Sequence, residues 1–199
     1  GRREFGPPEM LTADLAPLLL TLAQWGVADP TAMAWIDPPP SAALSAARQR
    51  LVSLDALDGE GRITPFGRKL AQLPMEPPLA AMVLFGAEAG DARGAARLAL
   101  LLQERGLGGR DVDLSSRLSR WESDRSARAE ASRKLADGWA KRAQALIPQK
   151  GAGGVDRGIL LARALPDNLA KRRDSGGESW ISAGGRGYVL DPTSSLARA

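Results

Sequence analysis

The chain has 199 residues and a net charge of +4, so a polyanionic partner is compatible with its composition but not required by it. The 44% of hydrophobic residues are enough for a core, and the absence of cysteine and histidine excludes disulfides, Cys/His zinc sites, cysteine nucleophiles and Ser-His-Asp triads. No apolar run approaches the roughly 20 residues of a membrane span, and no secretory signal opens the chain. We therefore expect a cytoplasmic protein without a membrane partner.

Residues 1–73 are predicted to form a winged-helix domain, although residues 1–6 precede the readable pattern and could be a cloning remnant. Apolar periodicity and start and stop signals predict helices at residues 15–25, 29–35, 41–54 (capped by Ser41) and 64–73. The turn Asp58–Gly61 is rich in residues that tolerate positive φ, and a short strand is expected at Arg62–Ile63. Helices joined by a tight turn and a strand are the outline of a winged helix.

Residues 74–172 are predicted to form an all-helical domain. The expected helices lie at residues 79–90, 91–102, 115–146 and 155–165. The third of them is long, and Gln149–Gly154 is interpreted as a glycine-rich connector.

Residues 173–199 switch to the alternating pattern of strands. Glu178–Ile181 and Gly187–Leu190 flank Ala183–Arg186, which is a hairpin signal. An isolated hairpin is only marginally stable in water. We therefore expect the first hairpin of a small β-barrel that is truncated after Ala199, and a chain that is mainly α overall.

Four motifs occur in a fixed order along the first half of the chain. They are Pro8-Glu9-Met10, Trp35-Ile36-Asp37-Pro38-Pro39, Arg62-Ile63-Thr64-Pro65-Phe66-Gly67-Arg68, and Leu73-Pro74 with Pro77–Met82. In this order they resemble the region that follows the motor in DEAH-box ATP-dependent RNA helicases. The stretches Asp14–Leu18, Leu101–Arg105 and Ala164–Asp167 resemble the bacterial HrpB type. Asp55 departs from the family, which has glycine there, and Asp191 stands where histidine is usual.

The resemblance implies an accessory region made of a winged helix, a helical ratchet domain and the start of an OB-fold. Such a region lines the single-strand channel of a 3′-to-5′ helicase whose motor domains, in cis, bind ATP and Mg²⁺. Its implied ligand is single-stranded RNA, with DNA as an alternative. The chain itself has no catalytic residue and no cofactor in this interpretation.

The residues agree with a missing motor. A phosphate loop of the form G-x-x-x-x-G-K-[ST] does not occur, and a DEAH box is impossible without histidine. Gly151–Gly154 is interpreted as a linker, because it lacks the lysine and a preceding strand. Asp111 and Asp113 are interpreted as charges at a helix N-terminus, and the Asp58–Glu60 pair as turn residues.

The predicted helix at 115–146 carries eight basic and four acidic residues, an excess equal to the net charge of the whole chain. Such a concentration is typical of phosphate contact, although a solvated helix face remains the alternative. Arg120, Lys134 and Lys141 lie away from the apolar stripe and are the candidate phosphate ligands. Lys171, Arg172 and Arg173 form a second basic cluster, after an apolar helix and before Asp174–Gly177.

Trp121 and Trp139 fall on one face of the same predicted helix, five turns apart. Leu114, Leu118, Leu135 and Leu146 share that stripe, so the tryptophans are predicted to be core residues rather than base-stacking platforms.

Two further hypotheses come from other functional classes. A DNA-binding winged-helix regulator should offer basic residues to the major groove from its third helix, but residues 41–54 contain only Arg48 and Arg50. A structural adaptor for another protein is the third hypothesis.

Overall fold

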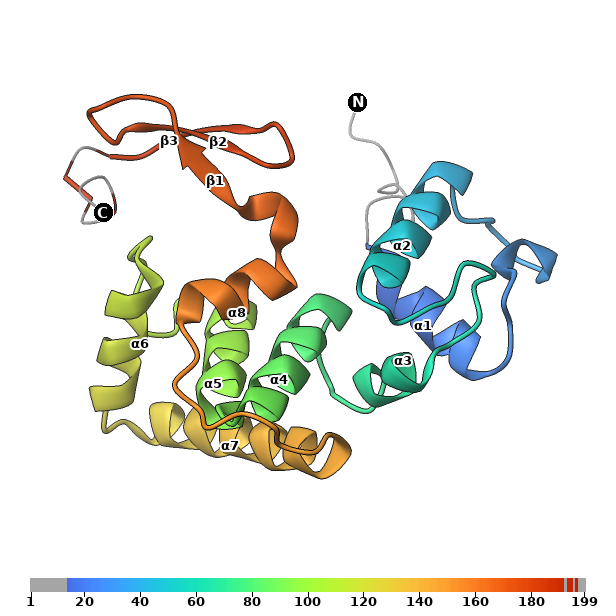
Figure 1. The fold of residues 1–199 in the computed structure, drawn as a ribbon, viewed down its shortest axis with the longest axis horizontal. Helices are drawn as coiled ribbons and strands as arrows, with labels where there is room; N and C mark the ends of the chain where they lie inside the picture. The colour runs from blue at the N-terminus through green and yellow to red at the C-terminus, as the bar shows by residue number, and fades with distance from the viewer. Residues whose placement is uncertain (1–13, 192, 195, 197–199) are drawn as a thin grey trace, which may run out of the picture. The chain divides into compact units, whose positions relative to one another are not determined.

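The computed structural model describes residues 14–191, 193, 194 and 196 (Figure 1). Residues 1–6 and the motif at residues 8–10 lie outside this part. The chain forms two compact units, residues 1–80 and residues 81–199. Helices predominate in both, as the sequence predicted, and no helix in the described part is long and apolar enough to cross a membrane.

The first unit contains three α-helices: α1 (Ala16–Gln24), α2 (Ser41–Ser53) and α3 (Pro65–Leu70). Their predicted apolar faces are buried, with Leu19, Leu51 and Leu70 at the centre of the core. Trp25, by contrast, is 74% exposed at the end of α1.

Three local predictions in this unit need correction. The segment after Asp29 makes only a 3₁₀ turn, Pro30–Ala32, because the Trp35 indole N–H donates to Pro30 O (2.8 Å) from extended backbone beyond the turn. The residue that caps α2 is Pro40, so Ser41 is already the first helical residue. The strand expected at Arg62–Ile63 is reduced to one antiparallel bridge between Leu57 and Ile63.

The turn that follows α2 depends on two unusual backbone positions. Asp55 has φ = 56°, a left-handed conformation that glycine adopts more easily than any other residue. Gly67 allows α3 to lie close to this turn, since a Cβ at Gly67 would be only 2.1 Å from Ala56 O. Thr64 fixes the start of α3, because its Oγ1 accepts from Gly67 N (2.8 Å).

Five helices make up the α-helical part of the second unit. They are α4 (Pro77–Ala89, which begins in the first unit), α5 (Ala92–Gln103), α6 (Leu114–Ser123), α7 (Ala127–Leu146) and α8 (Arg157–Ala164). Four of them begin with a side-chain cap, formed by Asp91, Asp113, Ser126 and Asp156 in turn.

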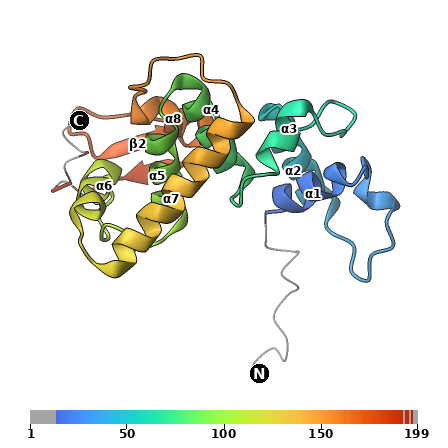
Figure 2. The same ribbon diagram turned by 90° about the horizontal axis from the view of Figure 1, so that it is seen from below.

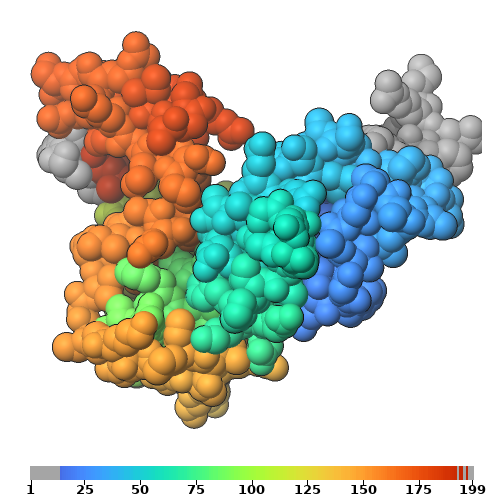
Figure 3. Space-filling view, turned by 45° about the vertical axis from the view of Figure 1, so that its right-hand side comes forward, coloured from blue at the N-terminus to red at the C-terminus, as the bar shows by residue number. Residues whose placement is uncertain are grey.

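α5 packs most extensively against α7, and Figure 2 shows α7 in front of α5. Small side chains make this close approach possible: the buried faces contain Ala92, Ala95, Ala96 and Ala99 on α5 and Ala129, Ala136, Ala140 and Ala143 on α7. The connector after α7 lies against α4, where Lys150 N and Gly151 N donate to Glu88 O (2.7 and 3.0 Å). Figure 3 shows this orange segment beside the green helices of the same unit.

The predicted long helix at 115–146 is wrong, because the chain breaks into α6 and α7 at residues 124–126. Asp124 Oδ1 accepts from Ser126 N (2.8 Å), and Ser126 Oγ accepts from Ala129 N (3.2 Å). Asp and Ser side chains that bond to nearby backbone in this way offer the chain an alternative to continuous helix.

A small antiparallel sheet ends the described chain, in the order β1 (Ala170–Arg172), β2 (Ser179–Ser182), β3 (Gly187–Val189). The predicted hairpin is confirmed as β2–β3. The first strand was not predicted. It contains Lys171 and Arg172, which the sequence placed after the last helix at the end of the domain 74–172.

Candidate nucleic-acid interface

α6 and α7 form a helical hairpin that is held together around Trp121. This side chain is 1% exposed, and its indole N–H donates to Ser132 Oγ on α7 (2.8 Å). Arg133 Nη1 in turn donates to Trp121 O (2.6 Å). Trp139 is also buried, so the prediction that both tryptophans are core residues is confirmed.

Arg120 lies on the exposed side of α6, but it is not a free cation. Its Nη2 is 2.6 Å from Asp111 Oδ2, and its Nε donates to Ser116 O (3.3 Å). The pKa of Asp111 is lowered by a hydrogen bond from Asp113 N and by the bond from Arg120. Asp113 Oδ1 accepts from Ser115 N (2.8 Å) as the cap of α6. Both carboxylates therefore stabilise the start of α6, as the sequence predicted.

Lys134 and Lys141 are exposed on α7. Seven residues separate them, which corresponds to about 10.5 Å along a helix. Glu130 and Asp137 precede the two lysines by four residues each and therefore lie on the same face. Asp137 is already bound to Arg93, at 3.0 Å between Oδ1 and Nε and 3.1 Å between Oδ2 and Nη2. The lysines thus project from a face of mixed charge.

A second basic edge of α7 was missed by the sequence analysis. Arg128, Leu135 and Arg142 follow one another at intervals of seven residues and share one edge of the helix. All three are exposed, and neither arginine makes a hydrogen bond or ion pair among the described residues. Leu135, predicted as core, is 49% exposed. The sequence pattern placed Leu135 on the apolar stripe, and only the packing of α7 shows that this edge of the helix is exposed.

Two other arginines of the predicted basic helix are structural. Arg117 donates from Nε to Leu107 O and from Nη2 to Leu101 O, both at 3.1 Å, and so closes the loop after α5. Arg133 binds Trp121 O, as described above. A count of basic residues therefore overstates the charge that this region offers to a ligand.

Lys171, Arg172 and Arg173 are exposed and follow α8 and the 3₁₀ turn Pro166–Asn168, as predicted, but the first two belong to strand β1. Arg172 stands opposite Trp180, which stands opposite Tyr188, so these three side chains share one face of the sheet. Lys171 points to the other face. Arg173 N donates to Ser179 O (2.8 Å), and Asp174 closes the turn by accepting from Gly177 N (2.8 Å) and Ser179 N (2.9 Å).

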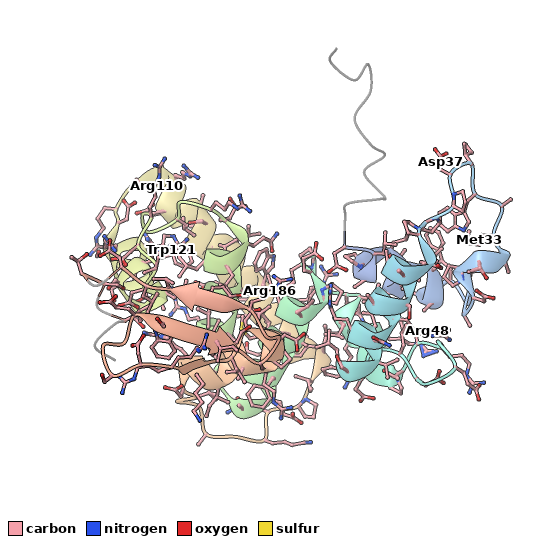
Figure 4. All side chains as sticks on the ribbon, turned by 90° about the horizontal axis from the view of Figure 1, so that it is seen from above. Met33, Asp37, Arg48, Arg110, Trp121 and Arg186 are labelled. Carbon is pink, nitrogen blue, oxygen red and sulfur yellow. The ribbon has the colours of Figure 1, made fainter. Side chains whose placement is uncertain are left out.

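The structure brings the six predicted residues together in two groups. Arg120, Lys134 and Lys141 belong to the α6–α7 hairpin, and Lys171, Arg172 and Arg173 lie in or directly after β1 of the same unit; Figure 4 labels Trp121 of the hairpin and Arg186 of the turn between β2 and β3.

Comparison with known proteins supplies the family. A family model for the winged-helix part of the helicase-associated domain (HA2) matches residues 47–75. The ATP-dependent RNA helicase HrpB of Escherichia coli K12 is 36% identical over 196 residues, which cover 96% of this chain and 22% of HrpB. The splicing-factor ATP-dependent RNA helicase prp22 of Schizosaccharomyces pombe is 41% identical over 83 residues, covering 42% of this chain and 7% of prp22.

Two crystal structures of E. coli HrpB match at 34% identity. One, described as a DExH-box NTPase, has a TM-score of 0.76 and covers 98% of this chain and 22% of that chain. The other, described as a DEAH/RHA helicase, has a TM-score of 0.79 and covers 97% and 23%. This chain corresponds to the C-terminal region of HrpB-type DEAH-box RNA helicases. It spans about a fifth of the length of HrpB and is an accessory helicase region, outside the motor domains.

Gly151–Gly154, the glycine-rich segment that could be mistaken for a phosphate loop, packs against α4. Gly153 N donates to Ala89 O (2.8 Å), and the neighbouring amides of Lys150 and Gly151 bind Glu88 O. These N–H groups are therefore occupied by the end of α4. The Asp58–Glu60 pair likewise binds Arg62, with Oδ2 of Asp58 3.0 Å from Nε and Oε2 of Glu60 2.5 Å from Nη2.

The winged-helix unit of this HrpB-type region gives little support to a DNA-reading helix. Of the two arginines on α2, Arg50 pairs with Asp14, and Arg48 lies in a cavity between α1 and α2. Arg50 is therefore engaged by a carboxylate, and Arg48 is half-buried, whereas a major-groove reader needs exposed basic side chains on this helix.

Proposed function

We propose that this chain is the accessory region of an ATP-dependent 3′-to-5′ RNA helicase. In this proposal it lines the single-strand channel and supports unwinding by motor domains, in cis, that carry ATP and Mg²⁺. The match to E. coli HrpB over 96% of the chain carries the proposal. The parent protein is cytoplasmic in this proposal, and single-stranded RNA is preferred to DNA as its ligand because the matched relatives are described as RNA helicases.

The three segments have separate parts in this proposal. Residues 1–73 serve as the winged helix, and residues 74–172 provide the ratchet helices. Residues 173–199, together with β1, begin the OB-fold. OB-folds bind single strands through a basic groove and aromatic platforms, and the sheet carries both kinds of residue.

RNA contact is proposed at the exposed basic residues of the hairpin and of the sheet. These are Arg120, Lys134 and Lys141 on α6–α7, with Arg128 and Arg142 added by the structure, and Lys171, Arg172 and Arg173 at β1. Contacts from lysine and arginine to phosphates fix position on a strand but carry no sequence information. Binding should therefore be independent of sequence and dominated by phosphate contacts.

The test is fluorescence anisotropy with two unrelated single-stranded RNA oligonucleotides. The triple variant Arg120→Ala, Lys134→Ala, Lys141→Ala should bind both more weakly and by similar factors. Its melting curve should match that of the parent, because the three side chains are exposed. A triple variant that binds as well as the parent would show that these charges form a solvated helix face and would favour the adaptor hypothesis.

A further inference from the structure

A cavity of about 210 Å³ opens in the first unit between α1, α2 and the segment Val27–Thr31. Its walls are apolar on one side, where Leu19, Leu44 and Leu57 are all buried core residues. Asp29, Thr31 and Arg48 supply the polar side. The cavity is smaller than the roughly 300–1,000 Å³ of sites that enclose whole drug-sized ligands. It is therefore suited to one residue-sized group.

Arg48 is the unexplained group in this cavity. It is half-buried on α2, and among the described residues it makes no hydrogen bond and no salt bridge. Its guanidinium lies next to Gly61, where an added Cβ would clash with Nη2. Arg50 and Arg62, in the same unit, both have carboxylate partners. A partly buried guanidinium with unused donors favours an oxyanion.

The nearby carboxylate of Asp29 does not serve as that oxyanion. Its Oδ1 accepts from Thr31 N (2.9 Å) and from Thr31 Oγ1 (2.7 Å). These bonds lower the pKa of Asp29, and the charge of Arg48 adds only a smaller effect. Asp29 thus caps the 3₁₀ turn, while Arg48, labelled in Figure 4, lines the same cavity without a hydrogen-bond partner among the described residues.

The apolar lining of the cavity determines which kind of oxyanion it can bind. A nucleic-acid phosphate would bring a hydrophilic sugar against Leu19, Leu44 and Leu57. A carboxylate attached to an apolar side chain matches both halves of the cavity. Within a polypeptide, an apolar side chain and a carboxylate share one carbon only at the C-terminal residue, and capture of a C-terminal carboxylate is a known mode of peptide recognition.

We propose that this cavity binds the C-terminal residue of a polypeptide, with its carboxylate on Arg48 and its apolar side chain against Leu19, Leu44 and Leu57. The site belongs to the first unit, whereas the proposed RNA-binding residues belong to the second, and the proposal does not depend on them. It gives the winged-helix unit a protein-binding role in addition to its place in the helicase.

The test is an NMR titration of the ¹⁵N-labelled 199-residue chain with N-acetyl-L-leucine. The Nε–H signal of Arg48 and the amide signals of Val27 and Gly61 report on the cavity directly. N-acetyl-L-leucinamide keeps the side chain but lacks the charge, and N-acetylglycine keeps the charge but lacks the side chain. We expect saturable shifts with N-acetyl-L-leucine and binding weaker by about 10-fold or more with either control.

Two variants separate the site from general effects on α2. Arg48→Gln should weaken binding of N-acetyl-L-leucine by about 10-fold or more, since a charged hydrogen-bond donor is lost. Arg50→Gln makes the same chemical change two residues away and should bind like the parent. Equal binding of the three probes to the parent, or no saturable shift at the three reporter signals, would overturn the proposal. These two results need no variant, so they hold even if Arg48→Gln fails to fold.

Discussion

Asp55 has a left-handed backbone conformation, which is strained for a residue with a Cβ atom. At φ = 56° an L-residue with a Cβ is strained by about 1–2 kcal/mol, and aspartate only partly escapes this penalty. The resembled helicases have glycine at this position, and the observed φ supplies the physical reason. The sequence flagged the departure, but only the backbone shows what the departure costs.

The variant Asp55→Gly should be more stable than the parent by up to about 1 kcal/mol, because relief of the strain exceeds the entropy that glycine adds to the unfolded chain. Urea unfolding followed by circular dichroism measures the difference. Asp37→Gly is the matched control, since Asp37 has no positive φ, and it should bring no gain. A lower unfolding midpoint for Asp55→Gly than for the parent would contradict the interpretation.

Trp121 is the residue on which the α6–α7 hairpin most depends. Trp121→Ala should destabilise the chain by about 3–5 kcal/mol, because it leaves a cavity and removes the indole donor to Ser132. Trp25→Ala removes the same side chain from an exposed position and should cost less than about 0.5 kcal/mol. Thermal unfolding of the two variants tests this contrast, and similar melting temperatures would count against the buried position of Trp121.

At the scale of elements, the sequence predicted the features that depend on neighbouring residues, such as the starts of several helices. Asp29, Thr64 and Asp91 cap the elements that follow them, because a cap is formed by residues two or three positions apart. The break at Asp124–Ser126 was not predicted. Trp121 and Trp139 are spaced as five turns of one helix, so the apolar periodicity continues across the break. A hairpin and a single helix share that spacing, and only packing distinguishes them.

The candidate site was predicted less completely than the elements. Exposure of Lys134 and Lys141 followed from helical phase. The pairing of Arg93 with Asp137 did not, because 44 residues separate the partners and their meeting depends on how α5 packs on α7. β1 was not predicted for a similar reason, because its three residues form a strand only by pairing with β2.

The pair Arg93–Asp137 links α5 to α7 and should make stability depend on pH. Hydrogen bonds from Arg93 are the main cause that lowers the pKa of Asp137 below its ordinary value of 3.8. A carboxylate with a lowered folded-state pKa stabilises the fold above its unfolded pKa, and this contribution is lost as the pH falls through the folded-state pKa.

Asp137→Asn should therefore lose less stability than the parent when the pH falls from neutrality to below 3.8. Urea midpoints at several pH values measure this difference. Glu130→Gln removes an exposed carboxylate from the same helix, outside any salt bridge among the described residues, and serves as the control. An Asp137→Asn variant whose acid sensitivity equals that of the parent would contradict the assignment.

The two basic faces of α7 can be separated by matched substitutions. Arg128→Gln with Arg142→Gln removes two charges from an edge that carries the exposed Leu135 and no acid. Lys134→Gln with Lys141→Gln removes two charges from the face shared with Glu130 and Asp137. The arginine pair should weaken RNA binding at least as much as the lysine pair, because no neighbouring carboxylate offsets its attraction for phosphate.

Loss of two phosphate contacts should reduce the salt slope by about 1.4, since each contact to a single strand contributes about 0.7. Anisotropy titrations at several salt concentrations give both quantities. If the arginine pair leaves affinity and slope unchanged, that edge of α7 makes no contact with RNA.

The whole molecule offers basic residues that can contact RNA, and its sequence contains no phosphate loop for ATP hydrolysis. The chain corresponds to an accessory region that spans 22% of the length of E. coli HrpB, and its one glycine-rich candidate loop is bonded to α4. Part of the positive charge near the α6–α7 hairpin is used in internal pairs, such as Arg120 with Asp111, while exposed basic residues such as Arg128, Arg142 and those at β1 have no salt-bridge partner in the described part of the chain. Such a molecule should hold RNA weakly and should gain nothing from nucleotide.

The most direct test of the central claim is the binding of the 199-residue chain to two unrelated single-stranded RNAs, measured by anisotropy against salt with and without ATP. The account predicts similar affinities for both RNAs, a salt slope of about −2 to −4 for a handful of phosphate contacts, and no change on adding ATP. Undetectable binding at low salt, a strong preference for one sequence, or an affinity that changes with ATP would contradict it.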